Sequence, residues 1–206
     1  MERVNEPGGA PACRFFLGRS ASGNVWSVGA AVPDDLAGEL DEFGRAEPVT
    51  ADWREPPRCR EAVVARLGSA EREWRGPAYL VPDDASANGR TIVVDRAGAA
   101  VLVGEFGWLS AELDEWAPCA AVVEDGRAVS VCFSSRVGSR ACEAGVETLP
   151  TFRGRGLAGQ AVARWAAEVR RRGKVALYST SWEHRASRRV AEKLGMRLYG
   201  EDWHVG

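Results

Sequence analysis

The chain has 206 residues, 45% of them hydrophobic, and its 27 basic and 29 acidic residues give a net charge of −2. This composition is typical of a globular protein, and the near-neutral charge argues against a nucleic-acid binder. Five scattered cysteines without a CxxC pair argue against a disulfide framework and a zinc site. Because no signal peptide and no membrane-spanning run is visible, we expect a reduced, cytoplasmic protein without a membrane or metal partner.

The first part of the chain mixes predicted strands and helices. Residues 1–13 are rich in glycine, proline and charge, and we expect them to be disordered. The apolar residues of 15–32 predict one or two strands around a Gly-Asn pair. Helical spacing of apolar residues predicts a short helix that begins at Asp34, and a second helix is expected over about 58–74.

Shorter elements follow in the middle of the chain. The apolar runs PAYLV, TIVV and VLVG predict three strands, the last two over residues 91–94 and 101–104. An acidic, helix-like piece is expected over residues 110–115.

The second half has a clearer order of elements. The β-favouring runs at 119–123 and 128–133 flank Glu-Asp-Gly-Arg, and Asp-Gly between such runs predicts a hairpin. The further elements that we expect are a strand over 141–149, a helix over 158–172, a strand over 175–179, a helix over 186–194 and a strand over 198–204. This order is typical of a layered α/β (α+β) protein.

The segment GVETLPTFRGRGLAG, residues 145–159, joins a predicted strand to a predicted helix. The first amides of a helix have no intrahelical partner, and the helix dipole adds a partial positive charge there. Gly154 and Gly156 let the backbone approach a ligand without a Cβ in the way. Such a turn can hold a pyrophosphate, and the guanidinium groups of Arg153 and Arg155 can add charge-assisted contacts.

The order RGRGLA, residues 153–158, after Thr-Leu-Pro resembles the acetyl-CoA motif Gln/Arg-x-x-Gly-x-Gly/Ala of the GCN5-related N-acetyltransferases. The residue order of this segment is most similar to that of the FR47-like branch of the superfamily. A second family-like segment, residues 183–187, leads into a helix that closes in Lys-Leu-Gly-Met. The resemblance implies an acyl-CoA N-acyltransferase fold, a mixed and mostly antiparallel central sheet flanked by helices.

The resemblance also implies an activity and a division of the chain. Residues 101–206 are expected to form the acetyl-CoA-binding core, and residues 1–100 an elaboration that contributes the acceptor side. The implied reaction is direct attack of a primary amine, from a small molecule or a peptide, on the thioester of the co-substrate acetyl-CoA. A longer acyl-CoA donor and a CoA-binding module without catalysis stay open as alternatives, and a homodimer is one option for assembly.

By the same resemblance, the strand before the turn lies along the pantetheine, and one of its backbone N–H groups polarises the thioester carbonyl. The expected cofactor-binding residues are Val146, Glu147, Thr148, Arg153, Gly154, Arg155, Gly156, Leu157, Ala158, His184 and Ser187. Glu147 is the first candidate for the catalytic base, because it lies where the acetyl group is expected. Glu143 is the second candidate, since it lies on the same face of a regular strand.

Two positions depart from the family's pattern. His184 stands where the family has Asn, and Ala191 stands where many members have a Tyr that acts as general acid. The thiolate therefore leaves unprotonated, or takes its proton from water, His184 or another group. Trp108 and Trp116 could line an acceptor pocket, although core packing is the simpler interpretation.

Overall fold

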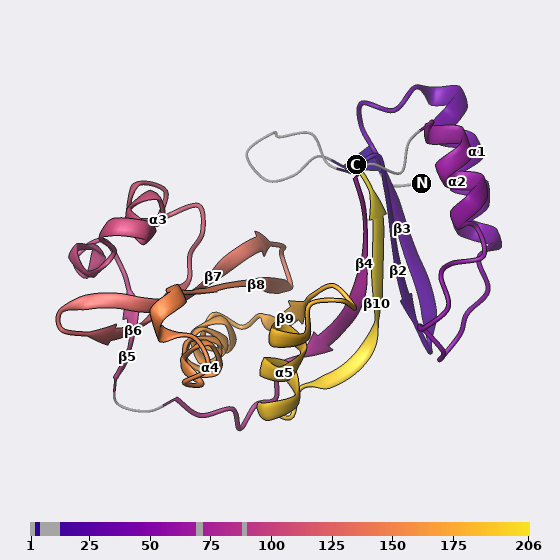
Figure 1. The fold of residues 1–206 in the computed structure, drawn as a ribbon. Helices are drawn as coiled ribbons and strands as arrows, with labels where there is room; N and C mark the ends of the chain where they lie inside the picture. Colours follow the sequence, from indigo (N-terminus) through magenta and orange to yellow (C-terminus); the bar gives the residue numbers. More distant parts are fainter. Residues whose placement is uncertain (1–2, 5–12, 69–71, 88–89) are drawn as a thin grey trace. The chain divides into compact units, whose positions relative to one another are not determined.

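The computed structural model describes residues 3–4, 13–68, 72–87 and 90–206 (Figure 1). Apart from residues 3–4 and 13, the segment expected to be disordered lies outside the described residues. The chain divides into two compact units. The first unit comprises residues 1–78, 179–184 and 198–206, and the second unit comprises residues 79–178 and 185–197.

The strands of the first unit follow the order β1-β3-β2-β10-β4. They are β1 (Arg3–Val4), β2 (Phe15–Ser20), β3 (Gly23–Gly29), β4 (Glu73–Leu80) and β10 (Arg197–Val205). Of the one or two strands expected within residues 15–32, two are present: β2 and β3 are antiparallel, and Leu17 lies opposite Trp26. On its other side β2 pairs antiparallel with β10, where Trp203 lies opposite Leu17.

Two helices complete the core of the first unit. Helix α1 (Asp34–Ala46) begins where predicted and has two aspartates in its first turn, which suits the helix dipole. Helix α2 (Arg60–Leu67) is shorter than the predicted helix over 58–74, so that prediction was wrong in extent. Gly68 adopts a left-handed conformation with φ 76° and ends the helix, and Trp74 belongs to β4. The apolar faces of these elements share one core, which includes Phe15, Leu17, Val28, Leu40, Val63 and Trp203.

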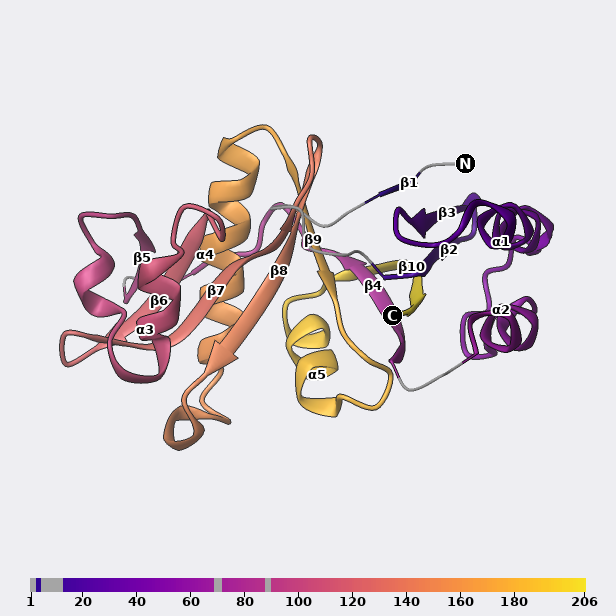
Figure 2. The ribbon, with the colours of Figure 1, turned by 90° about the horizontal axis from the view of Figure 1, so that it is seen from above.

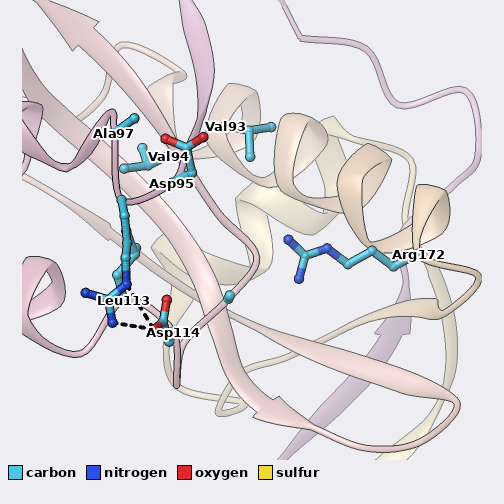
Figure 3. A pocket seen from close by; sticks show the side chains of 9 residues that line it. Val93, Val94, Asp95, Ala97, Leu113, Asp114 and Arg172 are labelled. Atoms are coloured by element: carbon cyan, nitrogen blue, oxygen red, sulfur yellow. Dashed lines mark hydrogen bonds and ion pairs between the residues drawn. The ribbon is translucent and has the colours of Figure 1, made fainter.

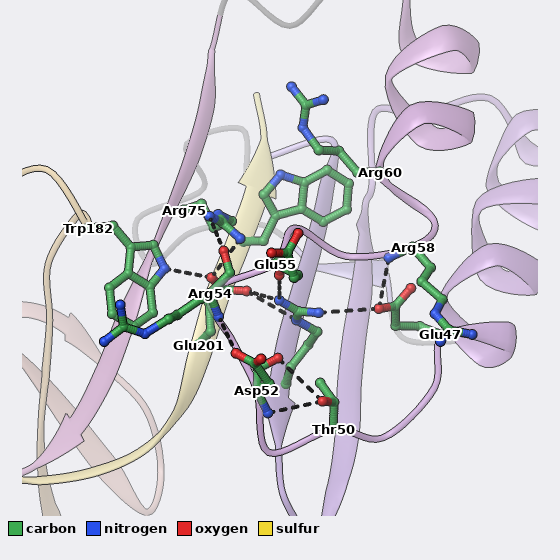
Figure 4. Close-up of polar contacts among 12 residues, drawn as sticks. Glu47, Thr50, Asp52, Arg54, Glu55, Arg58, Arg60, Arg75, Trp182 and Glu201 are labelled. Carbon is green, nitrogen blue, oxygen red and sulfur yellow. Dashed lines mark hydrogen bonds and ion pairs between the residues drawn. The ribbon is translucent and has the colours of Figure 1, made fainter.

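A buried ion network ties β2 of the first unit to β10 and to the loop after α1 (Figure 4). Arg19 is 4% exposed and Glu201 is fully buried. The guanidinium of Arg19 donates to Glu201 Oε2 (Nε, 3.1 Å), to Glu47 Oε1 (3.5 Å) and to the carbonyl of Glu55 (2.6 Å). Glu201 Oε1 accepts a further hydrogen bond of 2.7 Å from Trp182 Nε1. Each buried charge therefore has an opposite partner, as a structural network requires.

The same network fixes the start of α2. Glu47 accepts hydrogen bonds from the backbone N–H groups of Arg58 (3.1 Å) and Cys59 (2.9 Å), which precede the helix. These donors would otherwise lack a partner at a helix N-terminus. Burial, and after it the carboxylate of Glu47, raises the pKa of the Cys59 thiol to about 12.

The strands of the second unit follow the order β9-β8-β7-β6-β5. They are β5 (Thr91–Val94), β6 (Cys119–Glu124), β7 (Arg127–Val137), β8 (Ala141–Thr148) and β9 (Val175–Ser179). Neighbours from β5 to β8 are antiparallel, and only β8 and β9 pair in parallel. The predicted Asp-Gly hairpin is confirmed between β6 and β7, with positive φ values of 50° at Asp125 and 75° at Gly126.

One predicted strand in this unit was wrong. The run VLVG, residues 101–104, begins in the 3₁₀ turn η2 (Ala99–Val101) and ends in the 3₁₀ turn η3 (Gly104–Phe106). Leu102 is buried and Val103 is 52% exposed, so only part of the run faces the core, and the positive φ of Gly104 (63°) breaks the extended backbone. Helix α3 (Gly107–Ala111) follows, and it ends before most of the acidic residues expected to be helical.

Helices cover both faces of the second unit's sheet (Figure 2). Helix α4 (Leu157–Arg171) lies on one face and buries Val162, Trp165 and Val169, the stripe that the sequence predicts. Helix α5 (Arg185–Lys193) packs beside it, while α3 and the 3₁₀ turns cover the opposite face. A mixed, mostly antiparallel sheet flanked by helices is therefore confirmed. No helix among the described residues is long and apolar enough to cross a bilayer.

Candidate active site

The strands β8 and β9 of the second unit pair only at their beginning. Ala141 to Glu143 are in parallel register with Val175 to Leu177. Beyond that point β8 runs on to Thr148 with β7 as its neighbour. Over residues 144–148, β8 therefore has one backbone edge without a strand partner among the described residues. We call this stretch the open edge of β8.

The hydrogen bonds at the two ends of β8 show which residues face the open edge. The N–H of Leu149 donates to the carbonyl of Val129 on the β7 side (3.0 Å), and the carbonyl of Arg140 accepts from Val175 on the β9 side (2.9 Å). Backbone groups alternate along a strand, and the register shift in this pair falls on β7. The residues whose backbone groups face the open edge are therefore Ala144, Val146 and Thr148.

Side chains of β8 alternate between two faces as well. Gly145 lies opposite Phe133 in the register, so Glu143 and Glu147 share the face of Phe133. Glu147 is exposed, and its carboxylate has no hydrogen-bond or ion-pair partner among the described residues. Glu143 lies where β9 is still paired, and it forms an ion pair with Arg136 at 3.3 Å. Of the two predicted bases, only Glu147 lies at the open edge.

The glycine turn joins the open edge to α4. A 3₁₀ turn (Pro150–Phe152) follows β8, and then Gly154 and Gly156 adopt left-handed conformations with φ 77° and 78°. A Cβ at either glycine would meet no atom within 4 Å, so the backbone conformation itself requires glycine. Gly156 is the N-cap of α4, with no side-chain hydrogen bond to cap the helix and no acidic residue in its first turn. The first amides of a helix of 15 residues are thus left for an anion.

The two arginines of the turn hold its conformation. Arg155 Nη2 donates to Glu124 Oε1 at 2.7 Å, and its guanidinium lies 5.1 Å from the centroid of the Phe152 ring. Arg153 Nε donates to the carbonyl of Thr148 at 3.2 Å, at the end of the open edge. Both arginines remain exposed enough to contact a phosphate with their other N–H groups.

The second predicted motif is divided between the units. His184 is exposed and belongs to the first unit, where its N–H donates to the carbonyl of Ser181 (3.1 Å). Ser187 belongs to α5 in the second unit, and its Oγ is hydrogen-bonded to the hydroxyl of Tyr178. Ala191, at the family's tyrosine position, is fully buried.

Tyr178 is a candidate site residue that the sequence alone did not indicate. Its side chain is 1% exposed, and burial raises the pKa of the phenol to about 12, so it stays protonated at neutral pH. The only sequence signal was a tyrosine near the end of a short strand, which packing explains equally well. Cys142 is buried in the core as expected. No group of three His, Cys, Asp or Glu residues in the described ranges could hold a metal ion.

A shallow pocket of about 380 Å³ lies elsewhere in the second unit (Figure 3). Val93, Asp95 and Leu113 line it, together with the exposed ion pair between Arg96 and Asp114. Arg172, the last lining residue, is the C-cap of α4. Since a helix rises about 1.5 Å per residue, Arg172 lies about 24 Å along α4 from Gly156. None of the residues that line the pocket belongs to the open edge or the glycine turn, so the pocket is not part of the candidate active site.

Comparisons with known proteins agree with this geometry. Residues 118–201, which include the open edge and the glycine turn, match the family model GNAT acetyltransferase. No curated protein sequence matches the chain. The match does not separate the FR47-like branch from the rest, so the branch stays a prediction.

Several solved structures are similar to this chain. A protein assigned to the GNAT acetyltransferase family from Novosphingobium aromaticivorans is 20% identical with a TM-score of 0.52, over 66% of this chain and 65% of that one. A GCN5-related N-acetyltransferase-like protein from Streptococcus suis is 17% identical with a TM-score of 0.53, over 93% of this chain and 83% of that one. A GCN5-related N-acetyltransferase from Sphaerobacter thermophilus is 15% identical with a TM-score of 0.51, over 98% and 78%. At these identities the likeness establishes the fold alone.

Proposed function

This chain belongs to the GNAT acetyltransferase superfamily, as the match over residues 118–201 indicates, and from that premise we propose that it transfers an acetyl group from acetyl-CoA to a primary amine. The observation that carries the proposal is the junction of the open edge of β8 with the uncapped N-terminus of α4. The open edge suits an extended chain with amide groups, and the helix N-terminus suits a pyrophosphate. Acetyl-CoA carries both groups in one molecule.

Backbone groups of the open edge and the glycine turn would bind the donor, acetyl-CoA. Val146 and Thr148 would pair with the amides of pantetheine, and residues 153–158 would hold the pyrophosphate with main-chain N–H groups. The thioester carbonyl would accept a hydrogen bond from an N–H of the open edge, for which Val146 is our candidate. One such donor contributes about 3–4 kcal/mol to acyl-transfer catalysis in other enzymes. Glu147 contacts the ligand through its side chain alone, because its backbone groups face β7.

Deprotonation of the acceptor amine would depend on Glu147. An amine must lose a proton before it attacks, and the unpaired carboxylate of Glu147 can accept that proton directly or through water. The CoA thiol is acidic enough to leave as a thiolate. Ser187, hydrogen-bonded to the protonated Tyr178, is our candidate for returning a proton to the sulfur.

We also propose that the acceptor is the amine of a small molecule or a peptide. A homodimer and a cytoplasmic location are further proposals. The N-terminal elaboration as contributor to the acceptor side also stays a prediction. A longer acyl-CoA donor and a CoA-binding module without catalysis are the competing functions.

A charge change at the glycine turn tests the donor site. We expect acetyl-CoA to bind the wild type with micromolar affinity in calorimetry, and Gly156→Asp to abolish binding by placing a carboxylate beside the pyrophosphate. The matched control is Gly156→Asn, which has nearly the same shape and tolerates positive φ, and which should retain binding. No binding of acetyl-CoA to the wild type would refute the proposal. Binding without thiol release for any amine would favour the non-catalytic module.

A further inference from the structure

Three aromatic rings pack together on the face of the sheet that carries Glu147. Phe133 lies directly over Gly145, because a Cβ at Gly145 would be 2.5 Å from the Phe133 ring. Trp108 and Trp116 pack edge-on against Phe133, with ring centroids 5.3 Å and 5.6 Å away. We call Trp108, Trp116 and Phe133 the aromatic trio. Trp108 is 38% exposed, so the trio presents one ring to solvent.

The segment that supplies Trp108 and Trp116 carries acidic side chains and no basic ones. Residues 97–126 contain no Lys or Arg, although the whole chain has 27. Their carboxylates belong to Glu105, Glu112, Asp114, Glu115, Glu124 and Asp125. Arg96 neutralises Asp114, and Arg155 neutralises Glu124. The other four have no cationic partner among the described residues.

Glu112 connects this negative charge to the aromatic trio. Its Oε2 accepts a hydrogen bond of 2.9 Å from Trp116 Nε1, which fixes the carboxylate beside the rings. Glu147 is equally without a cationic partner among the described residues. It lies two residues after Gly145, over which Phe133 packs, and therefore on the same face of the sheet as the aromatic trio. Two carboxylates thus flank an aromatic surface, an arrangement that attracts organic cations.

The two sides of the site therefore differ in charge. The glycine turn carries Arg153 and Arg155 for an anionic donor, whereas the Glu147 face carries uncompensated carboxylates. An acceptor with its own carboxylate or phosphate would meet like charge on this face. A second ammonium group would meet opposite charge and an aromatic surface.

We propose, on the basis of the proposed function, that the acceptor is a diamine or polyamine whose second ammonium group binds against Glu112 and the aromatic trio. The reacting ammonium loses one proton to Glu147 or to water, and its nitrogen then forms the new C–N bond with the thioester carbon. The C–S bond breaks, its electron pair leaves with the sulfur, and the thiolate takes the second proton that the nitrogen loses. The products are the N-acetyl amine, CoA and one released proton.

Four-carbon acceptors that differ at one end test the proposal. Thiol release from acetyl-CoA is measured with putrescine, butylamine and γ-aminobutyrate, with calorimetry of acetyl-CoA alongside. We expect kcat/KM for putrescine to exceed that for butylamine by about tenfold, as one ion pair and one cation–π contact provide, with γ-aminobutyrate slowest. Glu112→Gln keeps an acceptor for the Trp116 N–H and removes only the charge. It should lower kcat/KM for putrescine about tenfold and leave that for butylamine unchanged.

The control is Glu61→Gln, the same charge change at an exposed position of α2 in the first unit. It should leave kcat/KM unchanged for both putrescine and butylamine. Equal or better turnover of butylamine or γ-aminobutyrate would overturn the inference and leave acetyl transfer standing. Acetyl-CoA binding without turnover of any of the three acceptors would overturn it as well. A chain that fails to bind acetyl-CoA would instead refute the proposed function itself.

Discussion

Replacing Arg19 by methionine tests the buried network of the first unit. The change leaves Glu201, which is fully buried, without its main counter-charge and removes hydrogen bonds to Glu47 and to the Glu55 carbonyl. Breaking a buried pair by removing one partner costs about 3–5 kcal/mol. Glu201 keeps Trp182 and Arg75, and Glu47 keeps two backbone donors, so we expect a loss near the lower end, about 3 kcal/mol.

The assay is urea denaturation at neutral pH, followed by tryptophan fluorescence and circular dichroism. The matched control is Arg66→Met, which breaks the exposed ion pair with Glu39 in the same unit and should cost less than about 1 kcal/mol. The double variant Arg19→Met, Glu201→Gln removes the stranded charge and should recover part of the loss. If Arg19→Met were as stable as Arg66→Met, the argument from buried charge would be refuted.

Three further predictions concern the site and the stability of the fold. Glu147→Gln should lower kcat by about 10²–10⁴-fold and leave the Kd for acetyl-CoA unchanged in calorimetry; an unchanged kcat would exclude Glu147 as the base. The hydrogen bond from Arg171, and then that from Arg172, holds the pKa of Glu168 at about 2. Its stabilising contribution is therefore present at neutral pH and lost as the pH falls from about 4.5 towards 2, so Glu168→Gln should flatten that part of the stability profile in acid denaturation. Gly68→Ala should cost about 1 kcal/mol in the same urea assay because of the left-handed backbone, and Gly68→Asn should cost less.

The sequence by itself determined the features that depend on local chemistry. Asp125 and Gly126 form the β6–β7 turn because their positions require positive φ, and these residue types accept it. The apolar stripe of α4 follows from helical spacing. The glycine turn could be recognised because its order of arginines and glycines before a helix is typical of an anion site. Each of these features involves residues that lie near one another along the chain.

Only the tertiary structure decided the features that depend on which strands meet. The end of the pairing between β8 and β9 separates Glu147 from Glu143, and the bonds at Arg140 and Leu149 decide which backbone groups are free. Nothing in the local sequence encodes where a neighbouring strand diverges. The pair of Arg19 with Glu201 joins positions 182 residues apart.

The wrong predictions have the same physical origin. The run at 101–104 has strand-like composition but covers a sheet instead of joining one, and the helix over 58–74 ends at Gly68. Composition measures what a segment prefers, whereas a strand exists only where a partner lies beside it. The local sequence therefore determined the turn and the helix that can hold an anion, and packing determined the open edge, the position of Glu147 on it and the charged face around them.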